Sequence, residues 1–234
     1  MKPLFIIASL LLLSLFSFSQ TQKGAWMLGA SVGSGTFSHT DSKDKNNSYT
    51  NQDNDTKTFA VALSPSALYF VSDNVALGAA ISFGYSSNNN TQTYPSSGTQ
   101  SSKSKAHYFP VSFDPEIRKY FGKPGSKGLP WVNIFGGVNT MPGKGTVEVI
   151  YNNEPFNGKG KYTSYGWNAG AGIGYAHFFN EHIALQYFIN FRHTWLRNTG
   201  NFNTPLLAMP VNYTNSNDIN FGVGLQIHLS KKTK

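Results

Sequence analysis

The 234-residue sequence contains no cysteine, and only 13% of its residues are charged, roughly half the usual share. The missing cysteine excludes a disulfide framework, a thiolate metal site and the lipid-modified cysteine of a bacterial lipoprotein. The scarcity of charge is unusual for a surface that faces water. Beyond the N-terminus no segment offers the ~18 uninterrupted apolar residues of a transmembrane helix. If the mature chain enters a membrane, it must do so with strands.

The formal net charge of +8 raises the question of a nucleic-acid partner. The lysines considered for this fall in a short turn, a loop and the C-terminal tail: Lys119, Lys123, Lys127; Lys103, Lys105; Lys231, Lys232, Lys234. A nucleic-acid site needs a basic stripe that interleaves with stacking aromatics on one face. These lysines are scattered along the sequence, so we expect no nucleic-acid partner.

The N-terminus has the three parts of a secretory signal. Lys2 supplies a positive charge, residues 4–16 (LFIIASLLLLSLF) form an apolar core, and Ser17 and Ser19 place small residues where a signal peptidase cleaves. A spanning helix needs about 20 apolar residues, so this segment is too short to be one. We expect residues 1–19 to be a cleaved signal peptide and residues 20–234 to form one domain.

Glycine and aromatic residues alternate through residues 168–191, NAGAGIGYAHFFNEHIALQYFINF. A helix would lose about 1 kcal/mol at each of its interior glycines. Period two fits instead, because Ile173 and Tyr175 fall on one parity while Gly172 and Gly174 fall on the other. The polar segment 180–182 is short enough only for a turn, so the stretch predicts two antiparallel strands.

The same alternation recurs along the chain and predicts eight strands. Their approximate ranges are 25–36, 57–70, 75–86, 106–121, 129–141, the two strands within 168–191, and 217–229. Short connections at 71–74, 122–128 and 180–182 alternate with long polar stretches at 38–56, 87–105, 142–160 and 198–216, which we interpret as surface loops. Strands of about 9–11 residues, short turns on one side and long loops on the other are typical of a transmembrane barrel. The sequence therefore predicts an all-β fold, an eight-stranded antiparallel up-and-down transmembrane β-barrel.

The residue types on the two parities favour a barrel whose apolar side faces lipid. A soluble ligand-binding barrel would carry lysine and glutamate on its water-facing wall, whereas the non-apolar parity here is mostly Gly, Ala, Ser and Asn. Small residues also suit the narrow interior of an eight-stranded barrel. Aromatic residues beside the short turns are expected to form an interfacial girdle: Tyr69, Phe70, Tyr120, Phe121, Phe178 and Phe179.

With these features the chain resembles the small outer-membrane β-barrel proteins of diderm bacteria, the OmpA/OmpX-like group often labelled as a porin family. The resemblance covers residues 20–234 and is carried by NAGAGIGYAHFF, by the hairpin YFVSDNVALGA and by the last strand, FGVGLQIHL. It implies an insertion signal at Gly224, Ile227 and Leu229 that the barrel-insertion machinery reads. The chain departs from the family pattern in ending that strand on leucine and in adding the tail SKKTK. The segment FSQTQ resembles signal-peptide ends of the Bacteroidetes group.

Polar residues on the inward parity predict a network inside the barrel, because isolated buried charges are prohibitively costly. The expected members are Asp114, Glu116, Arg118, Asn168, Gln186, Asn190, Arg192 and His228. Arg118 and Arg192 would face the two carboxylates. The network could be an ion gate, or a polar core that holds the barrel shut.

Six histidines are the candidates for catalysis: His39, His107, His177, His182, His193 and His228. No serine stands two residues from His193, as it does in the lipid A deacylases of this fold, and no histidine spacing fits a metal. We therefore expect no catalytic residue, cofactor or metal. The expected function is a non-enzymatic outer-membrane barrel that binds unknown ligands through its loops and contacts outer-membrane lipid and lipopolysaccharide. The alternatives are a small pore, a lipid-A-modifying enzyme and a secreted soluble barrel.

Overall fold

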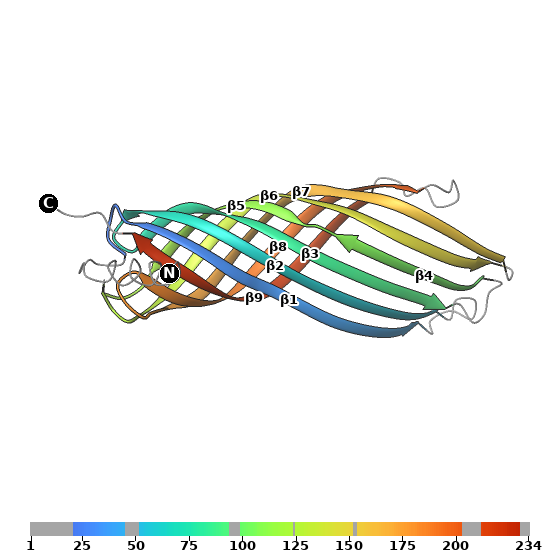
Figure 1. Cartoon of the computed structure of the whole chain (residues 1–234), viewed down its shortest axis with the longest axis horizontal. Coiled ribbons are helices and arrows are strands. Elements are labelled where there is room, and N and C mark those ends of the chain that lie inside the picture. Colours follow the sequence, from blue (N-terminus) through green and yellow to red (C-terminus); the bar gives the residue numbers. More distant parts are fainter. Residues whose placement is uncertain are drawn as a thin grey trace, which may run out of the picture.

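Long antiparallel strands make up almost all of the computed structural model, which describes residues 21–44, 52–93, 99–123, 125–151, 154–202 and 212–229 (Figure 1). The strands within these ranges are β1 (Trp26–Asp44), β2 (Gln52–Ser72), β3 (Val75–Thr93), β4 (Thr99–Tyr108), β5 (Val111–Tyr120), β6 (Gly128–Tyr151), β7 (Glu154–Phe178), β8 (Ile183–Phe202) and β9 (Asn212–Leu229). No helix in the described ranges is long and apolar enough to cross a membrane. The expected signal peptide, residues 1–19, lies outside them.

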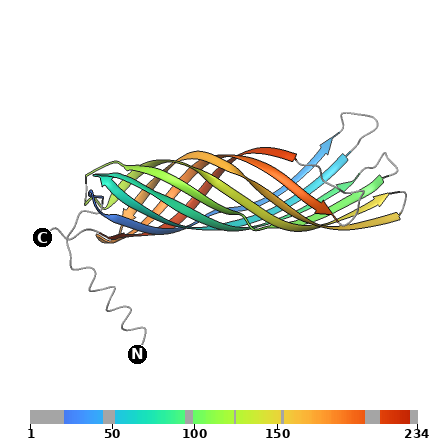
Figure 2. The same ribbon diagram turned by 90° about the horizontal axis from the view of Figure 1, so that it is seen from above.

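The strands form a closed ring in chain order. Neighbouring strands pair antiparallel, with β4 and β5 each pairing with both β3 and β6 rather than with one another. β1 pairs with β9 from Trp26↔Leu229 to Gly33↔Gly222, which joins the first strand to the last. The strands wind obliquely around the barrel axis (Figure 2). The prediction of an all-β, up-and-down antiparallel barrel is therefore confirmed.

The fourth position in the ring is an interrupted strand, so the described part of the chain has nine strands in an eight-membered ring. Phe109 and Pro110 separate β4 from β5, where one strand was expected over 106–121. Proline has no N–H to donate to a ladder. The neighbours still bond across the break, because the Gly84 N–H donates to the Pro110 carbonyl (2.8 Å) and the Phe109 N–H donates to the Pro142 carbonyl (2.9 Å). The wall therefore stays closed.

Alternate residues face opposite sides of this wall. Large apolar side chains point outward, and Val138 (61% exposed), Ile134 (60%) and Ile173 (59%) are typical. On β5, charged side chains point inward between outward Phe113 and Ile117, with Asp114 only 3% and Arg118 only 5% exposed. We call the outward apolar side chains between the short-turn end and the level of Tyr85, Phe109 and Tyr165 the apolar belt.

The four polar stretches expected to be loops are mostly strand, so that prediction is wrong. The pairing of β6 with β7 continues to Tyr151↔Glu154 and covers nearly all of 142–160. The other pairs reach Asp44↔Gln52, Thr93↔Ser101 and Asn198↔Asn212. A ladder continues wherever both partners stay extended, and polar composition reports the surrounding solvent rather than the backbone conformation. The strands are consequently longer than expected, with 24 residues in β6 and 25 in β7.

The expected aromatic girdle at the short-turn end is half wrong. Tyr69, Phe121 and Phe179 are exposed on the outside, as expected. Phe70, Tyr120 and Phe178 are almost completely buried inside the barrel, because successive residues of a strand face opposite sides. Half of the aromatic residues beside the short turns therefore fill the interior.

The backbone of β5 approaches Gly137 so closely that a side chain would not fit there. The ladder between β5 and β6 skips from Phe113↔Val138 to Glu116↔Phe135 around Pro115. A Cβ at Gly137 would lie 2.0 Å from the Phe113 carbonyl oxygen, whereas one at the adjacent Gly136 would have its nearest neighbour at 3.3 Å.

We expect Gly137→Ala to lower the free energy of unfolding by about 1–3 kcal/mol, since the backbone must move to admit the methyl group. Gly136→Ala is the matched control and should cost less than about 1 kcal/mol. Urea unfolding of the refolded barrel, followed by tryptophan fluorescence, measures both. Equal effects would contradict the close approach described for Gly137.

Candidate functional site

The interior nearest the short turns is filled with apolar side chains, which we call the apolar plug. Its members are 0–3% exposed: Met27, Leu68, Phe70, Tyr120, Leu129, Trp131 and Phe178. Tyr120 donates its hydroxyl to the Met27 sulfur (3.1 Å), and its ring lies 5.8 Å from that of Phe70. The plug closes the lumen at this end of the barrel.

The plug differs from the sequence-based prediction, which placed small and polar residues in the interior. Met27, Leu68 and Trp131 lie on the inward parity of their strands, next to outward apolar neighbours such as Trp26 and Tyr69. Parity could have revealed them, since strict alternation assigns adjacent residues to opposite faces. Near the short turns both faces of the strands are apolar.

Arg118 lies directly above the plug and forms one half of the interior network. Its guanidinium donates to Glu116 Oε1 (2.9 Å) and to Gln186 Oε1 (3.1 Å), and lies 4.1 Å from the centre of the Trp131 ring. Asn133 donates its amide to Glu116 Oε2 (2.7 Å). These groups come from β5, β6 and β8, so the pair ties separate walls of the barrel together.

Asp114 is the centre of the other half. Its carboxylate accepts hydrogen bonds from Arg192 (3.0 Å), Ser112 Oγ (2.7 Å) and the Asn168 amide (2.9 Å). Arg192 also lies 5.2 Å from the centre of the Phe135 ring. Each of the two buried carboxylates thus has its own arginine and additional donors, the arrangement that makes buried charge tolerable.

All eight residues expected in the interior lie on the inner wall, but not all in one network. Asn168 donates to Asp114 of one ion pair, and Gln186 accepts from Arg118 of the other. His228 lies lower, with its ring 5.1 Å from Phe178 and its Nε2 3.5 Å from Gln226 Oε1. Asn190 is half-buried, and its amide lies against Gly172. Three residues that sequence reasoning missed complete the network, namely Ser112, Asn133 and Gln226.

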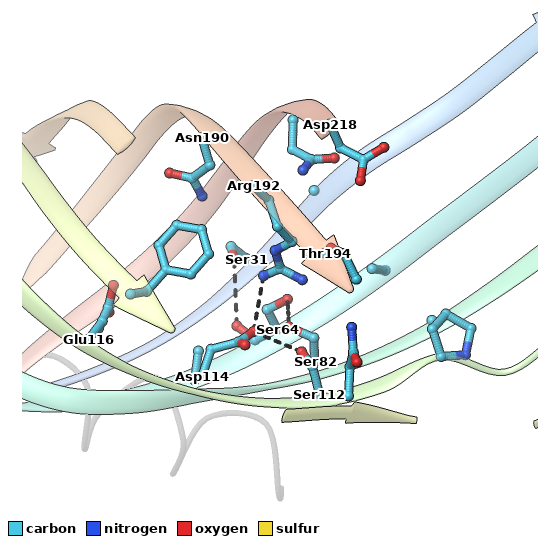
Figure 3. Close-up of a pocket in the computed structure, with 18 of the residues that line it drawn as sticks. Ser31, Ser64, Ser82, Ser112, Asp114, Glu116, Asn190, Arg192, Thr194 and Asp218 are labelled. Carbon is cyan, nitrogen blue, oxygen red and sulfur yellow. Dashed lines mark hydrogen bonds and ion pairs between the residues drawn. The ribbon is translucent and has the colours of Figure 1, made fainter. Parts of the chain in front are cut away.

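Above the network the lumen widens into a polar cavity of about 410 Å³. Its wall carries serine hydroxyls from three neighbouring strands, Ser31, Ser64 and Ser82, of which the last two hydrogen-bond to each other at 2.8 Å. Figure 3 shows Arg192 and Asp114 meeting across the cavity. Asp218 of β9 is the cross-strand partner of Arg192. The cavity therefore ends blindly on the ion pairs and the plug.

Three histidines in the described part of the chain bond to amide, phenol or backbone groups. His193 Nδ1 lies 2.5 Å from Asn217 Oδ1, His107 Nδ1 lies 2.8 Å from the Tyr85 hydroxyl, and His182 Nδ1 lies 3.0 Å from the His228 carbonyl oxygen. The side chain of His39 is outside that part. None of these contacts pairs a serine nucleophile with a base.

The residues of the expected insertion signal lie on β9. Gly224 faces the interior, where a Cβ would lie 2.7 Å from the Gln186 amide nitrogen. Ile227 and Leu229 are exposed on the outside. Residues 230–234, the tail SKKTK, are outside the described ranges. Recognition of this strand by insertion machinery stays a prediction.

No protein-family model and no curated protein sequence matches the chain. Among solved structures it is similar to the outer membrane protein OprG of Pseudomonas aeruginosa, with 16% identity, 92% of this chain and 100% of that one covered, and a TM-score of 0.49. It is also similar to a major outer membrane protein of Thermus thermophilus (10% identity, 87% and 99% covered, TM-score 0.47) and to Neisserial surface protein A (11%, 88% and 99%, TM-score 0.38). With such low scores, the function has to be argued from the chain's own side chains.

The ion pair of Arg118 with Glu116 gives a stability prediction. Arg118→Met removes the charge and leaves Glu116 buried without its cation, so we expect a loss of about 3–5 kcal/mol in the free energy of unfolding. The double variant Arg118→Met/Glu116→Gln should recover more than half of this loss. Lys119→Met, the adjacent exposed residue, should change stability by less than about 0.5 kcal/mol. Urea unfolding of refolded protein checks all three, and an additive double variant would exclude the coupling.

Proposed function

We propose that this protein is a non-enzymatic, integral outer-membrane barrel that conducts no ions and carries four long β-hairpins outside the cell for surface binding. The observation that carries the proposal is the apolar belt. A soluble protein rarely exposes a contiguous apolar patch beyond a few hundred Å², whereas here large apolar side chains face outward on every strand of the ring except β4. Such a surface is stable in contact with the acyl chains of lipid.

The distribution of polarity across the wall supports the same proposal. A soluble ligand-binding barrel has its apolar residues inside and its charges outside. In this barrel the Arg118–Glu116 ion pair is inside and Ile134 and Val138 are outside. A closed ladder also leaves no backbone edge unsatisfied in hydrocarbon. The secreted soluble barrel is therefore the weakest alternative.

The blocked interior argues against a pore. The plug and the two ion pairs fill the barrel between its short-turn end and the polar cavity, and the plug side chains are at most 3% exposed. A water-filled path would have to displace Trp131 and break the hydrogen bond from Arg118 to Gln186, which joins β5 to β8. We propose that the network is a polar core that holds the barrel shut rather than an ion gate.

The hairpins are the parts of the chain available to other molecules. Beyond the belt, β1–β2, β3–β4, β6–β7 and β8–β9 continue as paired strands (Figure 1). Outer-membrane barrels keep their short turns in the periplasm and their long connections outside the cell. Paired strands are stiffer platforms than open loops, so ligands would meet extended edges and faces. Adhesion, surface recognition and envelope integrity fit this surface, with outer-membrane lipid and the barrel-insertion machinery as the other partners.

The proposed orientation is testable because the chain contains no native cysteine. We expect Lys103→Cys in β4 and Lys159→Cys in β7 to react with a membrane-impermeant maleimide on intact cells. Asp73→Cys, in an exposed short turn, should react only after the outer membrane is permeabilised. Labelling of Asp73→Cys alone on intact cells would reverse the orientation, and recovery of the protein from the aqueous fraction would reject the membrane assignment.

The closed lumen predicts the behaviour of the purified protein in planar lipid bilayers. We expect no steady, resolved channels from the wild type at potentials where an open porin conducts. Phe70→Ala combined with Met27→Ala removes volume from the plug but keeps the ion pairs, so it should also stay closed. Stable unitary conductance in the wild type would contradict the blocked interior and favour the pore.

A further inference from the structure

Just beyond the apolar belt, strands β4, β6 and β7 present one outward face that is dominated by lysine. Cross-strand pairing arranges nine exposed residues of this face in three rows. The rows are His107–Lys144–Lys161, Lys105–Thr146–Lys159 and Lys103–Glu148–Asn157. We call these nine residues the lysine face. The five lysines come from three separate segments of the sequence, 103–105, 144 and 159–161, which the strand pairing brings together.

The lysine face has a strong charge imbalance. Its five lysines and one glutamate give it a net charge of +4 with His107 neutral, which is half of the formal +8 of the whole chain. Lys144 and Lys161 stand directly opposite each other on adjacent strands. Such strands lie about 4.8 Å apart, and like charges in directly opposed positions destabilise a sheet. A bound anion between the two ammonium groups would remove this repulsion.

The position of the lysine face relative to the belt identifies the anion. Lys105 lies four residues beyond Phe109, and Lys161 lies four residues beyond Tyr165, where Phe109 (55% exposed) and Tyr165 (44%) belong to the edge of the belt. Four residues of strand rise about 13 Å, which a typical barrel tilt reduces to about 10 Å above the hydrocarbon. Phosphate groups of membrane glycolipids lie at this depth. Aromatic side chains at the belt edge, Tyr85 and Phe109 with ring centres 5.6 Å apart, lie directly below it.

We infer that the lysine face binds the phosphate groups of glycolipids in the outer leaflet, with the acyl chains of the same molecule against the belt beneath. The inference rests on the proposed membrane location and orientation. Lys144 and Lys161 together contact one phosphate group. Lys105 and Lys159, in the next row, contact a second phosphate group. Lipid binding by this face would fix the rotation and depth of the barrel in the membrane.

The test uses the full refolded barrel in a detergent without charge, titrated with bisphosphorylated lipid A and with the same lipid A after enzymatic dephosphorylation. Each lysine near an anionic surface contributes about fivefold in affinity, so we expect Lys105→Gln/Lys144→Gln/Lys161→Gln to bind bisphosphorylated lipid A about a hundredfold more weakly. The matched control is Lys119→Gln/Lys123→Gln/Lys127→Gln, which removes the same charge at the short-turn end and should retain wild-type affinity.

Three outcomes would overturn the inference. They are equal binding of dephosphorylated lipid A, an equal loss in the two triple variants, and full competition by inorganic phosphate at the same phosphate concentration, which would indicate an anion site without a lipid. Heat-dependent gel migration confirms that each variant is folded. If cysteine labelling supports the proposed orientation but lipid A binding is unchanged in the lysine-face variant, only this inference fails and the proposed function stands.

Discussion

The hydrogen bonds between β1 and β9 are the interaction on which the rest of the structure depends. They convert an open sheet into a ring, because Trp26–Gly33 of β1 pair with Gly222–Leu229 of β9. In a closed ring, alternate residues of each strand face either the narrow interior or the surroundings. The outward parity can then be apolar on strand after strand without exposing the polar backbone.

Closure also explains why the interior is built in layers. An eight-membered ring leaves space that side chains can fill, and what fills it changes along the axis from the apolar plug through the two ion pairs to the polar cavity. Trp131 joins the first two layers, since its ring belongs to the plug while its face lies 4.1 Å from the Arg118 guanidinium. Contact with an aromatic face gives the buried cation a second source of stabilisation beside its carboxylate. The same side chains therefore block the lumen and hold separate walls of the barrel together.

The sequence could predict whatever depends on parity within one strand and little that depends on register between strands. The inward placement of Asp114, Glu116 and Arg118 follows from their spacing on β5. The bond from Asn133 to Glu116 does not, because it depends on how far β6 slides along β5. The same limit hides the lysine face, where Lys144 and Lys161 meet only through the β6–β7 register. The long hairpins escaped prediction for another reason, since Asn, Ser and Thr are common to loops and to solvated strands. Pro110 is the residue of the sequence that indicates the break between β4 and β5, where one continuous strand was expected.

The seam between β1 and β9 has a consequence for the route by which the protein folds. Trp26 and Leu229 are paired although roughly 200 residues of chain separate them, so closing the seam carries the largest entropic cost of any contact in the molecule. Local hairpins such as β6–β7 have no such cost and are expected to form early, as topology-controlled folding requires. A chain whose seam is open would expose two long strand edges together with an apolar outer face, a combination that favours aggregation. Pairing of β1 with β9 therefore protects the chain from aggregation as well as completing the barrel.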